Sequence, residues 1–410
     1  MTTYTINPNG LFPDPDVLGG MPELGEDTDD TKVQVQVLQN NATFCAFLLN
    51  FKESQPPPGI PRQLFVRIQK YAKDESPLVS AALTNLARTV LPLLVPKVWG
   101  SGYSWMKDGT KVSYVISEWY PDACPLETVW DDMDVENRGE IVEDLFEAVS
   151  KLCSLSLQKL TFEQWQLFRN TPFETKNTQL PILVGGPPYG YHTDFASLMR
   201  RNLCPRNADC AVKEKTDGTL IVSVHAPEAE YFGFAETDLG LLTQSSVLCH
   251  NDLEPHNLLV EKVSTERGEK YKLVAILNWD QAGFVPFAFE VARKDLHLGL
   301  RNFNWSWYDM YRQLAGHQLF DTPGCPIWSK LIRCLMAVHS SSQAKITEVS
   351  TSDGTAQMLW LEKEGLTFST LVEEGWVKMH SFVTFPADKN LDIWDSYGVP
   401  FLPQGGLREQ

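Results

Sequence analysis

The sequence predicts an α+β fold built from two unequal parts. The chain has 410 residues, and because compact domains usually span about 100–200 residues, two or three units are expected. Hydrophobic residues make up 43% and aromatic residues 11% of the chain, enough for extensive cores. Strand patterns with one helix fill residues 32–120, and mostly helical patterns fill residues 121–387. An arm (residues 1–31) and a tail (residues 388–410) flank them.

The first part is predicted to be a small five-stranded unit with one helix. Val33, Val35 and Val37 alternate with polar residues, which is the period of a half-buried strand. Four further apolar runs predict strands, at Phe44–Phe51, Leu64–Ile68, Leu94–Trp99 and Val112–Trp119. Ser76 can cap a helix between the third and fourth strands, because the apolar residues that follow share one face: Leu78, Ala82, Leu86 and Val90.

The second part has fewer strand signals. Residues 134–157 predict a long helix with an apolar stripe and acidic residues near its start. Residues 170–230 carry mixed polar stretches and are expected to be an irregular insertion. Strand patterns return at Ser246–His250, Leu258–Val263 and Lys272–Leu277, and the remainder to about residue 385 is expected to be mostly helical. An aromatic group in that remainder could line an acceptor pocket or belong to the core: Trp305, Trp307, Tyr308 and Tyr311.

Charge and composition exclude several classes of protein. A net charge of −17 and a pI near 4.9 disfavour nucleic-acid binding, which needs basic surface. The longest apolar stretch, Thr89–Trp99, contains two prolines and is too short to span a membrane. The first residues lack the pattern of a signal peptide, and the eight cysteines show no CxxC spacing. We therefore expect a cytoplasmic protein with reduced thiols and no membrane or nucleic-acid partner.

The segment His250–Val260 contains the spacing H-x-D-x-x-x-x-N between two apolar strands. This is the catalytic-loop spacing of kinases. Asp252 at a strand end can accept the proton of a substrate hydroxyl, while Asn257 can turn back to hold Mg²⁺. His250 is expected to brace the loop through hydrogen bonds. Glu254 is expected to face solvent.

A second segment, Ile276-Leu277-Asn278-Trp279-Asp280-Gln281-Ala282-Gly283, follows. With it the chain resembles the aminoglycoside phosphotransferase-like family of small-molecule kinases, which also includes choline-kinase-like proteins. That family shows a loop like HGDLxxxN followed by a segment like I-x-D-W-E-x-A-G. Other segments match the family in the same order along the chain: Val95–Val98 at the fourth strand, Ser117–Pro121 at the hinge between lobes, and Phe289–Arg293 after the metal loop.

The resemblance covers about residues 33–300 and implies a bilobal protein-kinase-like fold. It has a small five-stranded N-lobe with one helix and a larger, mainly helical C-lobe. It further implies an ATP- and Mg²⁺-dependent kinase that acts on a hydroxyl or amine of a small-molecule acceptor. Asp252 would orient or deprotonate the acceptor, and Asn257 and Asn278 would hold the metal. Arg67 would contact phosphate, and the hinge residues Glu118, Trp119 and Tyr120 would meet the adenine.

Several positions depart from the family pattern. Asn278 stands where the family has an aspartate, which removes the negative charge that a hard cation prefers. Arg67 replaces a lysine, and the helix glutamate that would pair with that lysine falls near Ser80. The turn Gln39–Thr43 contains no glycine, so close approach of its backbone to a phosphate is not favoured.

Three interpretations stay open at the level of sequence. The first is a working phosphotransferase with weakened metal and nucleotide sites. The second is a kinase-fold protein whose nucleotide site has decayed, used as a small-molecule binder or for non-phosphoryl chemistry. The third is an interaction protein that works through residues 1–31, a segment without Lys or Arg that is either a mobile arm or a docked strap.

Overall fold

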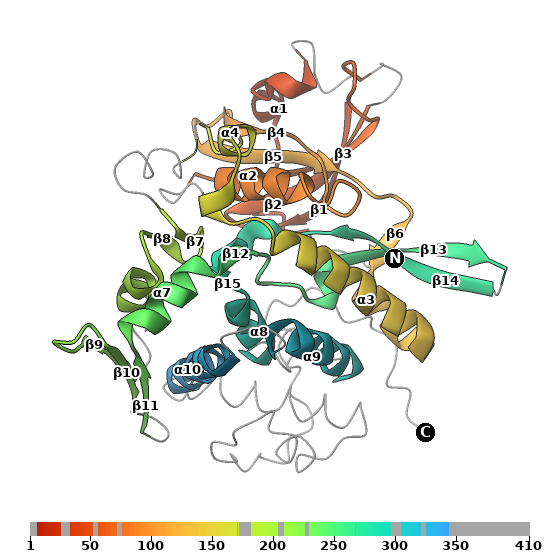
Figure 1. The fold of residues 1–410 in the computed structure, drawn as a ribbon. Helices are drawn as coiled ribbons and strands as arrows, with labels where there is room; N and C mark the ends of the chain where they lie inside the picture. The colour runs from red at the N-terminus through yellow and green to blue at the C-terminus, as the bar shows by residue number, and fades with distance from the viewer. Residues whose placement is uncertain are drawn as a thin grey trace, which may run out of the picture.

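The computed structural model describes eleven stretches of the chain: residues 6–25, 33–51, 56–71, 76–169, 171, 182–203, 209–225, 229–266, 268–296, 305–320 and 325–343. The predicted boundaries near residues 31 and 387, and the tail from residue 388, lie outside these stretches. The boundary at residue 120 stays a prediction. The described residues form an α+β fold (Figure 1).

A five-stranded antiparallel sheet dominates the N-terminal region, in the order β1-β2-β3-β5-β4. Its strands are β1 Val33–Asn40, β2 Phe44–Phe51, β3 Gln63–Lys70, β4 Val98–Trp105 and β5 Lys111–Glu118. Helix α2 (Ser76–Arg88) connects β3 to β4 as expected, and four of the five expected strands lie where the sequence predicted them. The strand predicted over Leu94–Trp99 is misplaced, because it begins only at Val98. Turn hydrogen bonds hold the residues before it, and Pro96 has no backbone N–H to donate to a sheet.

The N-terminal segment covers one face of this sheet. It contains α1 (Pro15–Gly19) and the short 3-10 helix η1 (Pro22–Leu24). Five of its apolar side chains are buried against the sheet residues of one hydrophobic cluster: Leu11, Val17, Leu18, Met21 and Leu24. The Ser104 hydroxyl donates to the Val17 carbonyl at 2.9 Å. Over residues 6–25 the arm is therefore the docked strap, one of the two forms that the sequence left open.

The rest of the described chain packs around a second, larger hydrophobic cluster, which includes α2. Its helices are α3 Val135–Leu152, α4 Phe162–Gln166, α6 Phe195–Leu198, α7 Glu236–Gln244, α8 Phe287–Leu296, α9 Trp305–Phe320 and α10 Cys325–Gln343, with the π-helix η5 Met199–Leu203. The 3-10 helices are η2 Leu126–Thr128, η3 Trp130–Asp132, η4 Leu157–Lys159, η6 Pro255–Asn257 and η7 Trp279–Gln281. The Asp134 carboxylate caps α3 by accepting from the Asn137 N–H.

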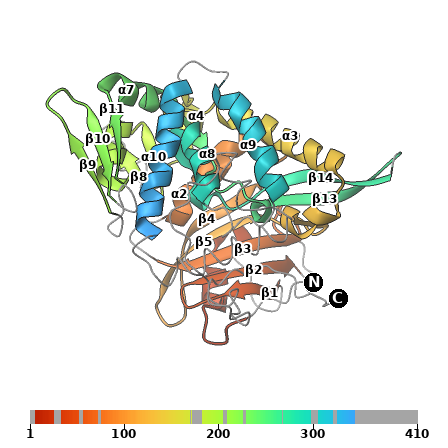
Figure 2. The same ribbon diagram turned by 90° about the horizontal axis from the view of Figure 1, so that it is seen from below.

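Three small sheets complete the fold. Their orders are β11-β10-β9, β12-β15-β7-β8 and β14-β13-β6. The strands are β6 Ala123–Pro125, β7 Val184–Gly186, β8 Gly190–His192, β9 Cys210–Glu214, β10 Leu220–Val224, β11 Glu230–Phe234, β12 Ser246–Cys249, β13 Leu258–Thr265, β14 Gly268–Ile276 and β15 Gly283–Pro286. The β9–β11 sheet and the β13–β14 hairpin project on opposite sides (Figures 1 and 2).

The prediction of an irregular insertion over residues 170–230 is wrong for the part that the structure describes. Five strands, β7 to β11, begin within this range. Two of them are only three residues long, too short to show a period. The pair β9–β10 joins through a tight turn in which Gly218 has a φ of +80°. No helix in the described stretches is long and apolar enough to cross a membrane.

Candidate active site

The loop His250–Asn257 lies between β12 and β13 and is packed tightly into the molecule. His250, Asn251 and Asp252 are all buried. Asn251 has a φ of 62°, a left-handed conformation that asparagine tolerates better than most residues. Its side-chain amide donates to the Gln281 carbonyl at 3.1 Å. The loop is thus bound to the segment that follows β14.

His250 connects the two segments in the way that the bracing role predicts. Its Nε2 lies 2.7 Å from the Leu277 carbonyl oxygen, and its Nδ1 accepts from the Asp252 N–H at 3.2 Å. This pair of bonds requires a neutral imidazole with its proton on Nε2. The edge of the imidazole also meets the buried Trp279 ring, with centroids 4.7 Å apart. His250 therefore fixes the backbone at Asp252 relative to the residue before Asn278.

Glu290 on α8 binds the same loop, and no motif in the sequence pointed to this role. Its Oε2 accepts from the His250 N–H at 3.1 Å, and the side chain is buried. The only sequence signal was its place in Phe289–Arg293, a segment noted for family resemblance and not for chemistry. For a buried carboxylate at the start of an apolar helix, neither the periodicity of the sequence nor the spacing of its residues indicates which group it will bind.

Asn257 is buried and turns back toward Asp252. Its Nδ2 donates to the Asp252 backbone carbonyl at 2.8 Å. Its own backbone carbonyl accepts from the Leu277 N–H at 2.8 Å. This arrangement uses the nitrogen of the side-chain amide, which leaves Oδ1 as the atom suited to a cation. The motif residues Asp252 and Asn257 are therefore held together by a direct bond.

Asn278 immediately follows Leu277, so it lies beside this loop. Its side chain is exposed and its φ is 60°. The structure thus brings Asp252, Asn257 and Asn278 into one region through the two hydrogen bonds that Leu277 makes. Trp279 is buried beside them, with its indole N–H donating to the Ile276 carbonyl at 3.0 Å.

Arg67 and Asp280 form a bidentate ion pair that the sequence did not predict. The two N–O distances are 2.5 and 2.7 Å, and both side chains are partly exposed. Burial would raise the pKa of Asp280, but the charge and hydrogen bonds of Arg67 outweigh it and lower that pKa. Burial would likewise lower the pKa of Arg67, and Asp280 raises it. The guanidinium expected to contact phosphate is therefore bound to a carboxylate of the neighbouring loop.

Helix α2 supplies no carboxylate to Arg67 at the expected position. Ser80 lies there, as the sequence indicated, and its side chain is buried. Because α2 packs directly against η7, the loop that carries Asp280 lies next to both α2 and β3. Asp280, and no carboxylate of α2 among the described residues, is therefore the group that Arg67 binds.

The hinge residues lie at the end of β5. Glu118 Oε2 accepts from the Lys97 N–H at 3.1 Å and from the Tyr120 hydroxyl at 3.2 Å. The Trp119 ring stacks on Phe65 of β3, with centroids 6.5 Å apart and planes 13° from parallel. Phe65 was not identified from the sequence. The side chains of Glu118 and Trp119 are thus engaged within the protein.

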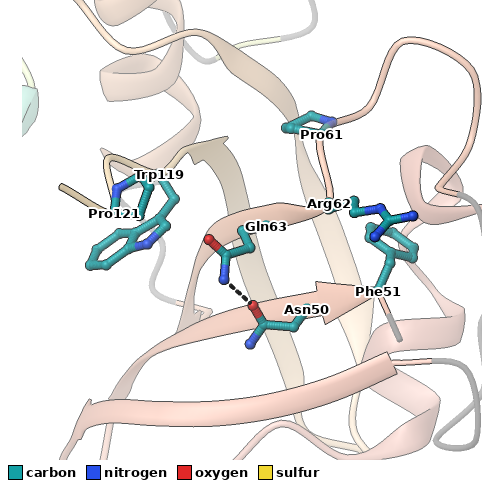
Figure 3. Close-up of a pocket in the computed structure, with 7 residues that line it drawn as sticks. All are labelled: Asn50, Phe51, Pro61, Arg62, Gln63, Trp119 and Pro121. Carbon is teal, nitrogen blue, oxygen red and sulfur yellow. Dashed lines mark hydrogen bonds between the residues drawn. The ribbon is translucent and has the colours of Figure 1, made fainter. Parts of the chain in front are cut away.

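Trp119 also borders an open hollow of about 530 Å³ at the ends of β2 and β3 (Figure 3). Pro121 lies beside Trp119, and a hydrogen bond of 2.8 Å from Gln63 Nε2 to Asn50 Oδ1 crosses the floor. The remaining lining residues are Phe51, Pro61 and Arg62. Because side chains alternate along a strand, Gln63 shares the face of β3 that carries Phe65 and Arg67.

Two carboxylates, those of Glu254 and Glu127, lie close to the loop. Glu254 is buried, so the expectation that it faces solvent is wrong. It lies in a tight turn in which its N–H bonds the Asp252 carbonyl, and the helix that follows packs against η2. In η2, burial and then the charge of Glu254 raise the pKa of Glu127 to about 7.

The oxygen ligands at the site match Mg²⁺ in atom type and fall short in charge. Asn257 and Asn278 offer amide oxygens, and Asp252 is the carboxylate of the same loop, whereas Asp280 is bound by Arg67. Within the described stretches, no group of three or more His, Cys, Asp or Glu side chains is arranged to hold a metal ion. The aromatic residues Trp307, Tyr308 and Tyr311 are fully buried and belong to the core.

No protein-family model and no curated protein matches this chain. Solved structures of aminoglycoside phosphotransferases are similar to it. A thermostable mutant of APH(4)-Ia is 14% identical with a TM-score of 0.39, covering 84% of this chain and 95% of that one. The GDP and kanamycin complex of APH(2")-IIia is 11% identical with a TM-score of 0.39, covering 83% and 93%.

A third similar structure is the spectinomycin phosphotransferase APH(9)-Ia with ADP and spectinomycin. It is 11% identical with a TM-score of 0.28, covering 76% of this chain and 92% of that one. All three are structures of aminoglycoside phosphotransferases, the family that the two motifs of this chain resemble.

Proposed function

We propose that the chain is an ATP-dependent phosphotransferase that acts on a hydroxyl or amine of a small molecule. The observation that carries the proposal is the bond from Asn257 Nδ2 to the Asp252 carbonyl. Together with the His250 bond to Leu277, it keeps Asp252, Asn257 and Asn278 in one region, which supports the roles proposed for them. Phosphoryl transfer depends mainly on such positioning and on charge neutralisation.

Asp252 would act on the acceptor. Its carboxylate would take the proton of the acceptor hydroxyl while the acceptor oxygen bonds to the γ-phosphorus of ATP. The bond from that phosphorus to the bridging oxygen would break, and ADP would leave. Mg²⁺, held through Asn257 and Asn278, would supply charge neutralisation at the phosphates. His250 would stay neutral and keep the Asp252 backbone in position.

ATP as donor is in keeping with the cytoplasmic location that we expect. Four of the described cysteines are free thiols, which suits a reducing compartment: Cys45, Cys124, Cys153 and Cys249. We expect a small-molecule acceptor and no nucleic-acid or membrane partner. The acidic net charge of the chain agrees with this expectation.

Asp252→Asn tests the proposal directly. We expect the loss of about 10²–10⁴-fold in phosphate transfer, because the amide cannot accept the proton. The assay is release of ADP and transfer of labelled γ-phosphate, with water, kanamycin and spectinomycin as acceptors. Asp217→Asn, in the β9–β10 turn, is the matched control and should keep the wild-type rate. An unchanged rate in Asp252→Asn, in a variant that unfolds at the wild-type temperature, would remove Asp252 from the mechanism.

A second candidate is a kinase-fold protein that no longer uses ATP and binds a small molecule or performs non-phosphoryl chemistry. The ion pair between Arg67 and Asp280 favours it, since the phosphate-binding cation is already neutralised. Neutral Asn278 at the metal position favours it as well.

Asn278→Asp discriminates between the two candidates. Restoring the carboxylate should tighten MgATP binding about tenfold in a working site, because Mg²⁺ prefers charged oxygen ligands. Titration calorimetry at 5 mM Mg²⁺ measures the change. Asn9→Asp, at an exposed position of the N-terminal segment, serves as the control for added charge. The same weak or absent binding in Asn278→Asp as in the wild type would favour the second candidate.

A further inference from the structure

One face of strand β3 carries the side chains that meet the candidate site. Leu64, Val66 and Ile68 are fully buried in the cluster beneath the N-terminal segment. Because successive side chains of a strand point to opposite faces, Phe65 and Arg67 lie on the other face. Trp119 of the hinge and Asp280 of η7 meet them there.

Both of these side chains are already engaged. The Phe65 ring lies parallel to Trp119, and the Arg67 guanidinium uses two N–H groups on the Asp280 carboxylate. The two residues are about 7 Å apart along the strand, given a rise of about 3.3 Å per residue. One contact therefore occupies the hinge end of this face, and the other occupies the end beside Asn278.

A nucleotide bound on this face would occupy both the end at Phe65 and Trp119 and the end at Arg67. Its base would lie against the hinge, where Phe65 now stacks on Trp119. Its phosphates would seek the guanidinium, whose fork fits a phosphate as well as it fits a carboxylate. Asp280 would also repel the phosphates through its own negative charge. Each internal contact therefore competes with one part of the nucleotide.

We propose that the Phe65–Trp119 stack and the Arg67–Asp280 ion pair together form a latch that closes the nucleotide site in the ligand-free protein. The inference rests on the proposed function, because it takes ATP as the ligand. Asp280 sets the affinity for the triphosphate, and Phe65 sets the affinity for the base. The apparent affinity for ATP is the affinity of the open form multiplied by the fraction of molecules in which the latch is open, so a mostly closed latch weakens binding.

The test uses the full chain and two ligands, MgATP and inorganic triphosphate, in titration calorimetry. Asp280→Asn keeps the shape of the side chain and removes its charge, and Phe65→Leu keeps the strand apolar and removes the ring. Gln69→Ala is the matched control, because Gln69 is the next residue on the same face of β3. Thermal unfolding of each variant checks that the fold is retained.

The latch predicts that the two variants differ in which ligand they bind more tightly. Asp280→Asn should bind both ligands about tenfold more tightly than the wild type, whereas Phe65→Leu should gain about tenfold for MgATP alone. The double variant should gain about a hundredfold for MgATP, since the two contacts share no residue. Gln69→Ala should bind both ligands as the wild type does.

Three other outcomes overturn one or both proposals. If the wild type binds MgATP and the variants bind no better, or bind worse, the two contacts only support the structure. The latch is then wrong, and the phosphotransferase stands. If no protein binds either ligand at millimolar concentration, both the latch and the use of ATP are wrong. If the variants gain affinity as expected and no protein transfers phosphate to any acceptor, the latch stands and the phosphotransferase falls.

Discussion

Glu127 is a side chain near the candidate site whose pKa lies close to neutral pH. Burial and the nearby Glu254 raise its pKa to about 7. One of its carboxylate oxygens, Oε1, is buried and makes no hydrogen bond with the described residues. A buried carboxyl without a donor is more stable when it is protonated. The folded protein therefore holds this proton at a pH where the unfolded chain, with a pKa of about 4.3, has released it.

This difference predicts a pH-dependent contribution to stability. Because the folded pKa lies above the unfolded one, the contribution is present below about pH 4.3 and is lost as the pH rises through about 7. Glu127→Gln stays neutral, so it should gain stability relative to the wild type between pH 5 and 8. We expect a relative gain on the order of 1 kcal/mol after allowance for partial exposure.

Urea unfolding at pH 5 and pH 8 measures this gain. Glu261→Gln, on an exposed position of β13, is the control and should show no such trend. A Glu127→Gln variant whose stability follows the wild type at both pH values would mean that Glu127 is already charged in the fold.

Individual residues differ in how far the sequence reveals them. His250, Asp252 and Asn257 lie within eight residues, so their spacing alone indicated a loop that brings them together. Arg67 and Asp280 are separated by 213 positions, and no local pattern relates them. Glu254 was misjudged for a similar reason, because its burial comes from the packing of η6 against η2.

At the scale of elements, the N-terminal segment is part of the folded core of the five-stranded sheet. Met21 has no exposed surface, and it packs with Val17, Leu18 and Leu24 against the strands. Polar contacts add to this packing. The Tyr114 hydroxyl donates to Glu23 at 2.9 Å, and the Asn40 side chain bonds both Asn7 and Leu11. These contacts weaken the interpretation that residues 6–25 are a free interaction arm.

Met21→Ala is expected to lower the free energy of unfolding by about 2–5 kcal/mol, because it leaves a cavity beneath the sheet. Chemical denaturation measures the loss. Leu93→Ala serves as the control, since Leu93 is 86% exposed, and should change stability by less than about 0.5 kcal/mol. A Met21→Ala variant as stable as the wild type would show that the segment does not support the sheet.

Some strands could be predicted from the hydrophobic pattern of the sequence, and others could not. The strands β1, β2, β3 and β5 were predictable because their apolar residues alternate or form runs between turn residues. The strands β7 and β8 have three residues each, and β7 is Val-Gly-Gly, so no period exists to detect. The two strands form a local hairpin, and β7 pairs with β15, a strand about 100 positions later, through a tertiary contact.

At the scale of the whole molecule, the five-stranded sheet lies between two buried clusters. The N-terminal segment fills one, and α2 joins the other, which also contains Leu253, Leu258 and Trp279 around the loop His250–Asn257. The sheet face that carries Arg67 is therefore set against the loop that carries Asp280. This arrangement brings Arg67, Asp252, Asn257 and Asn278 into one region, and the proposed function assigns them the roles of cation, base and metal ligands.

The central claim is that this region binds ATP through Mg²⁺, and titration calorimetry of the wild-type protein with ATP tests it most directly. The titration is run with 5 mM Mg²⁺ and again with EDTA, and is repeated on Asn257→Ala after its thermal unfolding has been checked. We predict weak, saturable binding that requires Mg²⁺ and is lost in Asn257→Ala. Absence of binding in the wild type, or binding that neither EDTA nor Asn257→Ala alters, would contradict the claim.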